Sequence, residues 1–137
     1  MLRIGICDDS AEARQHMLQL CQKYYENNTD AFEYKMYKNA EEVLEYCDDE
    51  ENQKIDILFL DIEMDGLSGI KLKERVLKLD KIWRIAFVSS HDEKMIESFG
   101  IKTIDFIRKP AGYMDVKAVL EKVLICLLYT SDAADEL

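Results

Sequence analysis

The residues best suited to chemistry in this chain are polar side chains that follow short, mostly apolar stretches. They are Asp8 and Asp9 after residues 2–7, Asp61 after 55–60, Ser89 after 85–88, and Lys109 after 104–108. In an open parallel sheet, ligand sites form where the carboxyl ends of the strands meet. We therefore expect these residues to share one crevice, where they could bind a divalent cation and handle a phosphoryl group.

Three of these residues are carboxylates, and crowded carboxylates oppose one another's ionisation unless a cation lies between them. Mg²⁺ suits such a site because it prefers oxygen ligands from carboxylates, water and phosphoryl groups. The pattern therefore predicts that Asp8, Asp9 and Asp61 hold Mg²⁺. Taken alone, Asp8 and Asp9 would be read as ordinary turn or helix-start residues, so the prediction depends on the four strand ends together.

The remaining candidates could contact the phosphoryl group itself. Lys109 offers a compact cation. It precedes Pro110, the only proline of the chain, and a cis X–Pro bond could aim the lysine into the crevice. Ser89 offers a hydroxyl donor, although a simple turn with Ser90 is the alternative. Phe106 lies three residues before Lys109, and both core packing and a switching role stay open for it.

Strand and helix patterns alternate along the whole chain. The expected strands are residues 2–7, 31–37, 55–60, 83–88 and 103–107. The expected helices are 10–26 with Ser10 as its cap, 39–47 with an Asn39–Glu42 capping box, one after Gly69, a short one over 92–99, and a last one around 116–123. Apolar strands without alternation indicate a parallel sheet that is covered on both faces. The prediction is thus an α/β fold, a flavodoxin-like (βα)5 doubly wound parallel sheet in the order 2-1-3-4-5.

The composition limits the partners of this chain. Its 137 residues suit one domain, and its net charge of −10 with scattered lysines and arginines argues against nucleic-acid binding by this fragment. We find neither an apolar run long enough to span a membrane nor a signal peptide, so a cytoplasmic protein with no membrane partner is expected. The four cysteines lack the spacing of a zinc site, and Cys7 is expected to be a core residue.

Together these motifs resemble the receiver domain of two-component response regulators. The resemblance covers residues 2 to about 125 and rests on Ile6-Cys7-Asp8-Asp9-Ser10, Leu60-Asp61-Ile62-Glu63-Met64, Gly69, Phe87-Val88-Ser89-Ser90, and Asp105-Phe106-Ile107-Arg108-Lys109-Pro110. It implies that Asp61 is the phospho-acceptor and that Asp8, Asp9, Asp61 and the backbone carbonyl of Glu63 bind Mg²⁺. It further implies that Lys109 pairs with the phosphoryl group, that Ser89 is the switch hydroxyl and that Phe106 is the switch aromatic residue.

The chain departs from the common receiver pattern at three positions. Asp65 stands where many receivers have proline, Ser89 replaces the commoner threonine, and Phe106 replaces the commoner tyrosine. The segment from Phe87 to Phe106 is similar to receivers of the LytTR type, which usually carry a C-terminal DNA-binding domain. None of these departures removes the chemistry that the resemblance implies.

The end of the chain does not resemble a receiver. Residues 126–136 match a translated transposase sequencing adapter in all eleven positions, and a natural helix end with an acidic tail is the alternative. We therefore expect a receiver domain over 1–125 and a non-native tail over 126–137, with a truncated gene and a missing output domain.

The resemblance implies a phosphorylation-dependent signalling protein that assists its own phosphorylation and dephosphorylation, rather than a turnover enzyme. A sensor histidine kinase would donate the phosphoryl group to Asp61. The face formed by residues 92–99, the strand 103–107 and the last helix would then change shape, which could control a homodimer. A stand-alone receiver is one alternative. The rival classes are a haloacid-dehalogenase-like phosphatase, which needs an Asp-x-Asp where this chain has Asp61-Ile62-Glu63, and a flavodoxin-type cofactor binder.

Overall fold

The computed structural model describes residues 2–26, 31–62, 75, 80–90 and 102–136. Its strands are β1 (Leu2–Cys7), β2 (Phe32–Tyr37), β3 (Ile55–Asp61), β4 (Ile82–Ser89) and β5 (Thr103–Arg108). Its helices are α1 (Ala11–Glu26), α2 (Ala40–Asp48) and α4 (Tyr113–Glu136). The helices expected after Gly69 and over 92–99, together with Glu63, fall on residues outside the described ranges.

The five strands form one sheet in the order β2-β1-β3-β4-β5, and every neighbouring pair is parallel. This order confirms the one that the sequence predicts. The register pairs Cys7 of β1 with Leu60 of β3, so the next residue of each strand, Asp8 and Asp61, emerges at the same edge of the sheet. The same edge receives the ends of β4 and β5, where Ser89 is paired with Arg108.

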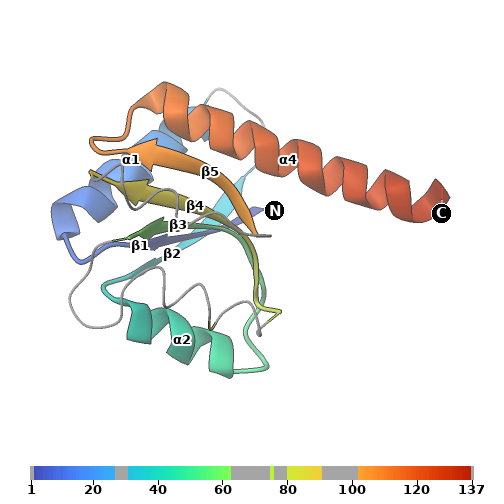
Figure 1. Ribbon diagram of the computed structural model, residues 1–137, viewed down its shortest axis with the longest axis horizontal. Coiled ribbons are helices and arrows are strands. Elements are labelled where there is room, and N and C mark those ends of the chain that lie inside the picture. The colour runs from blue at the N-terminus through green and yellow to red at the C-terminus, as the bar shows by residue number, and fades with distance from the viewer. Residues whose placement is uncertain (1, 27–30, 63–74, 76–79, 91–101, 137) are drawn as a thin grey trace.

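Helices cover both faces of the sheet, with α1 and α4 on one side and α2 on the other (Figure 1). The side of α1 and α4 has a core that includes Ile4, Phe59, Val88, Val119 and Leu120. A second core lies on the side of α2 and includes Tyr37, Val43, Leu58, Leu60 and Phe87. Both cores draw on the same central strands, which explains why those strands read as continuous apolar runs.

Two side-chain caps fix where the helices begin. The Ser10 hydroxyl accepts a hydrogen bond from the Ala13 amide at the start of α1. The Asn39 side chain accepts one from the Glu42 amide at the start of α2, as the capping prediction requires. The Glu42 carboxylate accepts a hydrogen bond from the Lys38 amide, one residue earlier than the amide that a standard capping box would use.

Gly5 lies where β1 approaches the second core most closely. A Cβ atom on this residue would lie 2.9 Å from Leu58 Cδ1 and 3.3 Å from a ring carbon of Tyr37. Tyr37 and Leu58 are both almost fully buried, so neither has room to withdraw. The absence of a side chain at residue 5 therefore lets the α2 side of the sheet close.

The last helix is longer than the sequence analysis expected, because α4 continues to Glu136. Residues 113–137 contain neither glycine nor proline, so the chain carries no strong stop signal after residue 125. Leu127 packs against the core of α1 and α4, whereas Leu128 and Tyr129 are exposed. The end of α4 extends past the sheet (Figure 1). The origin of residues 126–137 stays a prediction.

In the described part of the chain, every helix is too short or too polar to cross a bilayer.

Candidate metal and phosphoryl site

Three carboxylates converge at the carboxyl edge of the sheet. Asp8, Asp9 and Asp61 each place a carboxylate oxygen within 4.8 Å of those of the other two. Asp8 and Asp61 are buried, with 6% and 4% of their surface exposed, and Asp9 is open to solvent. The structure therefore brings together the three acids that the sequence singles out, with one of them at the mouth of the site.

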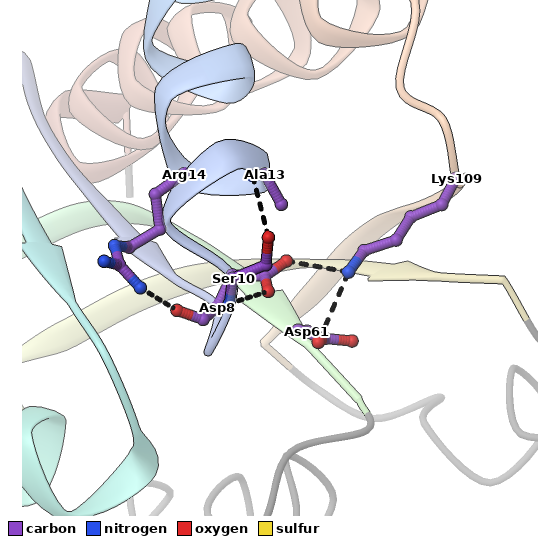
Figure 2. Close-up of polar contacts among 6 residues, drawn as sticks. All are labelled: Asp8, Ser10, Ala13, Arg14, Asp61 and Lys109. Carbon is purple, nitrogen blue, oxygen red and sulfur yellow. Dashed lines mark hydrogen bonds and ion pairs between the residues drawn. The ribbon is translucent and has the colours of Figure 1, made fainter.

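Lys109 lies between the two buried acids (Figure 2). Its Nζ atom is 2.7 Å from Asp8 Oδ2 and 3.3 Å from Asp61 Oδ2. Burial on its own lowers the pKa of Lys109, but the hydrogen bond to Asp8 and the charge of Asp61 outweigh it, so the pKa is raised above the ordinary lysine value. The lysine therefore stays charged at neutral pH and offsets part of the negative charge of the site.

The start of α1 holds Asp8 in place. Asp8 Oδ1 accepts a hydrogen bond of 2.9 Å from the Ser10 amide, and the Asp8 carbonyl accepts one of 2.7 Å from the Arg14 guanidinium. Figure 2 shows both contacts beside the Ser10 cap. Arg14 was not among the predicted site residues, although a basic residue near the start of a helix, where acids are favoured, is a signal that could have found it.

The loop that follows β5 is held from two sides. The Lys109 amide donates a hydrogen bond of 2.9 Å to the Ser89 carbonyl, and the Lys109–Pro110 peptide is cis, the form that the sequence analysis considered. On the other side, His16 Nε2 of α1 lies 2.7 Å from the Ala111 carbonyl oxygen. The sequence analysis did not identify His16, and no local pattern links it to a residue 95 positions away.

Ser89 and Phe106 lie on the two strands next to the acids. Ser89 is 1% exposed at the end of β4, one residue past Val88, which pairs with Asp61. The Phe106 ring stacks on Phe87 with ring centroids 5.9 Å apart and packs against the α2 core. Ser89 is therefore at the edge of the site, and Phe106 occupies a packing position beside it. Their switching roles stay predictions.

A cavity of about 710 Å³ opens beside these groups. Asp8, Asp61 and Lys109 line it together with residues of α1, including His16, and with Pro110 and Ala111 of the loop. The acidic site thus continues into a cleft between α1 and the loop after β5, where a phosphoryl donor could approach.

The donor set fits a hard divalent cation. Three carboxylates within reach of a single ion provide oxygen ligands, which Mg²⁺ prefers. The nearby Cys7 is a poor ligand, because burial, followed by the charges of Asp8 and Asp61, raises the pKa of its thiol far above the ordinary value. The site therefore offers oxygen rather than sulfur, as Mg²⁺ requires.

Comparison with known proteins agrees with this geometry. The chain matches the response regulator receiver domain family over residues 4–121. It is 28% identical over 122 residues to the sensory transduction protein LytT of Bacillus subtilis, covering 89% of this chain and 48% of LytT. It is 31% identical over 130 residues to the accessory gene regulator protein A of Staphylococcus epidermidis, covering 92% of this chain and 52% of that protein. The chain thus spans about half the length of the curated relatives it matches.

A solved structure shows the same fold. The response regulatory domain of mrkE from Klebsiella pneumoniae superposes with a TM-score of 0.77 at 23% identity, over 91% of this chain and 97% of that one. The family match favours a receiver over the phosphatase and flavodoxin-type alternatives. With most of its length matched and the sheet order of that fold, this chain belongs to the response regulator receiver domain family of two-component systems.

Proposed function

We propose that Asp61 accepts a phosphoryl group from a sensor histidine kinase in a reaction that depends on Mg²⁺. The observation that carries the proposal is the position of Lys109 Nζ between the buried carboxylates of Asp8 and Asp61, with Asp9 beside them. Asp8, Asp9, Asp61 and the Glu63 carbonyl would hold the ion. The bound ion would supply positive charge for the oxygens of the transferring group.

In the transfer step, a carboxylate oxygen of Asp61 attacks the phosphorus atom and the bond to the donor nitrogen of phosphohistidine breaks. The electron pair of that bond stays on the imidazole, and the product is an aspartyl phosphate that water later hydrolyses. Lys109 stabilises the phosphoryl oxygens by its charge, which is where catalysis of phosphoryl transfer mainly acts. The protein therefore assists its own modification and does not turn over a separate substrate.

The new phosphoryl oxygens would then reorganise the neighbouring strand ends. Ser89 and Lys109 would bond to them, and Phe106 would move from its place beside Phe87. This is a local change of charge that biases an element with two arrangements. β5 and α4, together with the helix that the sequence predicts over residues 92–99, would carry the change to a partner, either a second copy of the chain or an output domain.

A LytTR-type DNA-binding domain is the output that we propose for the complete protein. The relatives described above are about twice as long as this chain, and the name of one of them describes a gene regulator. In this arrangement the fragment itself would bind no DNA, consistent with its net charge of −10. A stand-alone receiver remains the second candidate.

The decisive experiment is phosphorylation by acetyl phosphate with Mg²⁺, followed on a phosphate-affinity gel. Wild type should give a shifted band, and Asp61→Asn or a chelator should remove it. Asp56→Asn is a matched control, because Asp56 lies on the same strand and accepts a hydrogen bond from the Arg3 amide instead. A shifted band that survives both Asp61→Asn and chelation would refute the assignment.

The proposed change in self-association has its own test. Beryllofluoride, which mimics the aspartyl phosphate, should raise the mass measured by light scattering, and Ser89→Ala should weaken that response. Charge-assisted hydrogen bonds contribute roughly 1.5–3 kcal/mol each, which is enough to invert a minor state of a few per cent. An unchanged mass with beryllofluoride bound would mean that this face does not act through dimerisation in the fragment.

A further inference from the structure

Helix α1 contacts both the turn that carries Asp8 and the loop that follows Lys109. The start of α1 holds the Asp8 turn through the amide of its cap, Ser10, and through the Arg14 guanidinium. Two residues after Arg14, His16 reaches the loop that follows Lys109, and Lys109 in turn binds Asp8 and Asp61. The acidic turn and the lysine loop therefore share α1 as a common support.

We propose that His16 is a positioning residue for the transfer of the phosphoryl group to Asp61. By donating a hydrogen bond to the Ala111 carbonyl, it fixes the loop that presents Lys109 to the two buried carboxylates. This inference rests on the proposed function of Asp61. It assigns His16 no contact with the phosphoryl group or with the metal ion.

The Ala111 carbonyl needs a donor at this position. Ala111 is 7% exposed and packs in the core of α1 and α4, and a buried carbonyl without a hydrogen bond is unfavourable. Since a carbonyl oxygen can only accept, the Nε2 atom of His16 must carry the proton. The contact thus joins an exposed side chain on α1 to a nearly buried backbone group of the loop.

The other contacts of the loop leave His16 a distinct role. The Lys109 amide is fixed to the Ser89 carbonyl on the strand side, and the Gly112 amide is fixed to Asp115 at the start of α4. Between these two points, the link to α1 passes through the Ala111 carbonyl. Without that link the bonds of the Lys109 and Gly112 amides should open more often, so the orientation of Lys109 is less well fixed while the fold is retained.

This role differs from simple packing in what it predicts. The proposed ligands Asp8 and Asp9 follow β1 and Asp61 ends β3, so a change at His16 removes no ligand and should not weaken Mg²⁺ binding. Loss of the side chain leaves the Ala111 carbonyl without this donor, so the melting temperature of His16→Ala should fall modestly and should recover in His16→Gln. The transfer rate should fall, because Lys109 would spend less time aimed at the transferring group.

The test compares the rate of phosphorylation by acetyl phosphate at saturating Mg²⁺ in four proteins. His16→Ala should slow the reaction roughly 2- to 12-fold, the range that corresponds to one hydrogen bond. His16→Gln keeps an N–H donor of similar reach and should restore most of the rate. Gln22→Ala is the control, since Gln22 is exposed on the same helix and lies away from the cavity. Mg²⁺ affinity from calorimetry should not fall in any of the variants.

Amide hydrogen exchange provides a readout that does not depend on phosphorylation. Exchange at the Lys109 amide should be faster in His16→Ala and should return to the wild-type rate in His16→Gln. If wild type reacts while His16→Ala keeps both its transfer rate and its exchange rate, the inference is wrong and the proposed function stands. If wild type takes no phosphoryl group from the donor, the proposed function is wrong, and the inference that rests on it is wrong as well.

Discussion

Replacing Lys109 by methionine should destabilise the protein strongly when no Mg²⁺ is present. The substitution keeps much of the aliphatic length but removes the cation that lies 2.7 Å from Asp8 and 3.3 Å from Asp61. Two buried carboxylates then face each other, with an exposed third one close by. Like charges in a buried site oppose ionisation, so the folded state becomes less stable relative to the unfolded chain.

The structure sets the size of this effect. At an effective dielectric constant of about 20, contacts at these two distances are each worth roughly 5–6 kcal/mol before desolvation is subtracted. Desolvation offsets most of that gain, and removing one partner of a buried ion pair typically costs about 3–5 kcal/mol. Because the Lys109 side chain keeps 28% of its exposure, we expect the low end of that range, about 3 kcal/mol.

Urea unfolding followed by the fluorescence of Trp83, the single tryptophan, measures this loss. Mg²⁺ should restore more stability to Lys109→Met than it adds to wild type, because the ion replaces the missing charge. Lys122→Met is the matched control. Lys122 pairs with Asp105 at 2.8 Å, but its side chain is 51% exposed, so its loss should cost at most about 1 kcal/mol.

The difference in stability between wild type and Lys109→Met should depend on pH in a defined direction. The pKa of Lys109 is raised in the folded state, so its stabilising contribution is complete below the ordinary lysine value of 10.5 and is lost as the pH rises through the raised value. The difference in stability between wild type and Lys109→Met should therefore be constant through neutral pH and should disappear as the lysine loses its proton in strong alkali. Equal stability of the two proteins at neutral pH without Mg²⁺, or a rescue by Mg²⁺ no larger than in wild type, would refute the reasoning.

Three further predictions concern the fold. Gly5→Val should lower the free energy of unfolding by about 1–3 kcal/mol, since the valine side chain would meet Leu58 and Tyr37. Gly112→Ala is the control and should change this free energy little, because its Cβ would only touch Asp115 at 3.4 Å. Equal effects of the two substitutions in a urea titration would contradict the packing argument. Asn39→Ala should cost about 1 kcal/mol by removing the cap of α2, and Asn39→Asp should retain most of that energy. Deleting residues 126–137 should leave phosphorylation intact, because every candidate site residue precedes them. A large drop in melting temperature after this deletion would show that more of the segment than Leu127 is packed.

The sheet and the acidic cluster could be predicted because both depend on local patterns. Continuous apolar runs identify central strands, and the residue after each run falls at the carboxyl edge whatever the details of packing. Strand ends differed from the prediction by at most one residue, for example at Ile82 and Arg108, which is within the usual uncertainty of an element boundary. The order 2-1-3-4-5 then followed from the alternation of strands and helices.

The contacts that orient the site could not be predicted in the same way. Arg14 binds a backbone carbonyl, and His16 binds a loop 95 residues away, so both contacts depend on how α1 sits on the sheet. The extent of α4 was also missed, because a composition that resembles an adapter still has good helix-forming residues. For Phe106, the stack on Phe87 supports the packing interpretation and leaves the switching role to experiment.

Both carboxylate oxygens of Asp8 are already engaged by the protein, Oδ1 by the Ser10 amide and Oδ2 by Lys109. Each oxygen keeps a second lone pair, but a metal ion bound there would place a second positive charge close to Lys109 Nζ, and the repulsion between the two would weaken the contact of the lysine. The lysine acts as an internal competitor, and the net affinity for the ion is the difference between two interactions. Such a site should release Mg²⁺ more readily than three carboxylates alone would, so its loading should follow the free ion concentration rather than stay saturated.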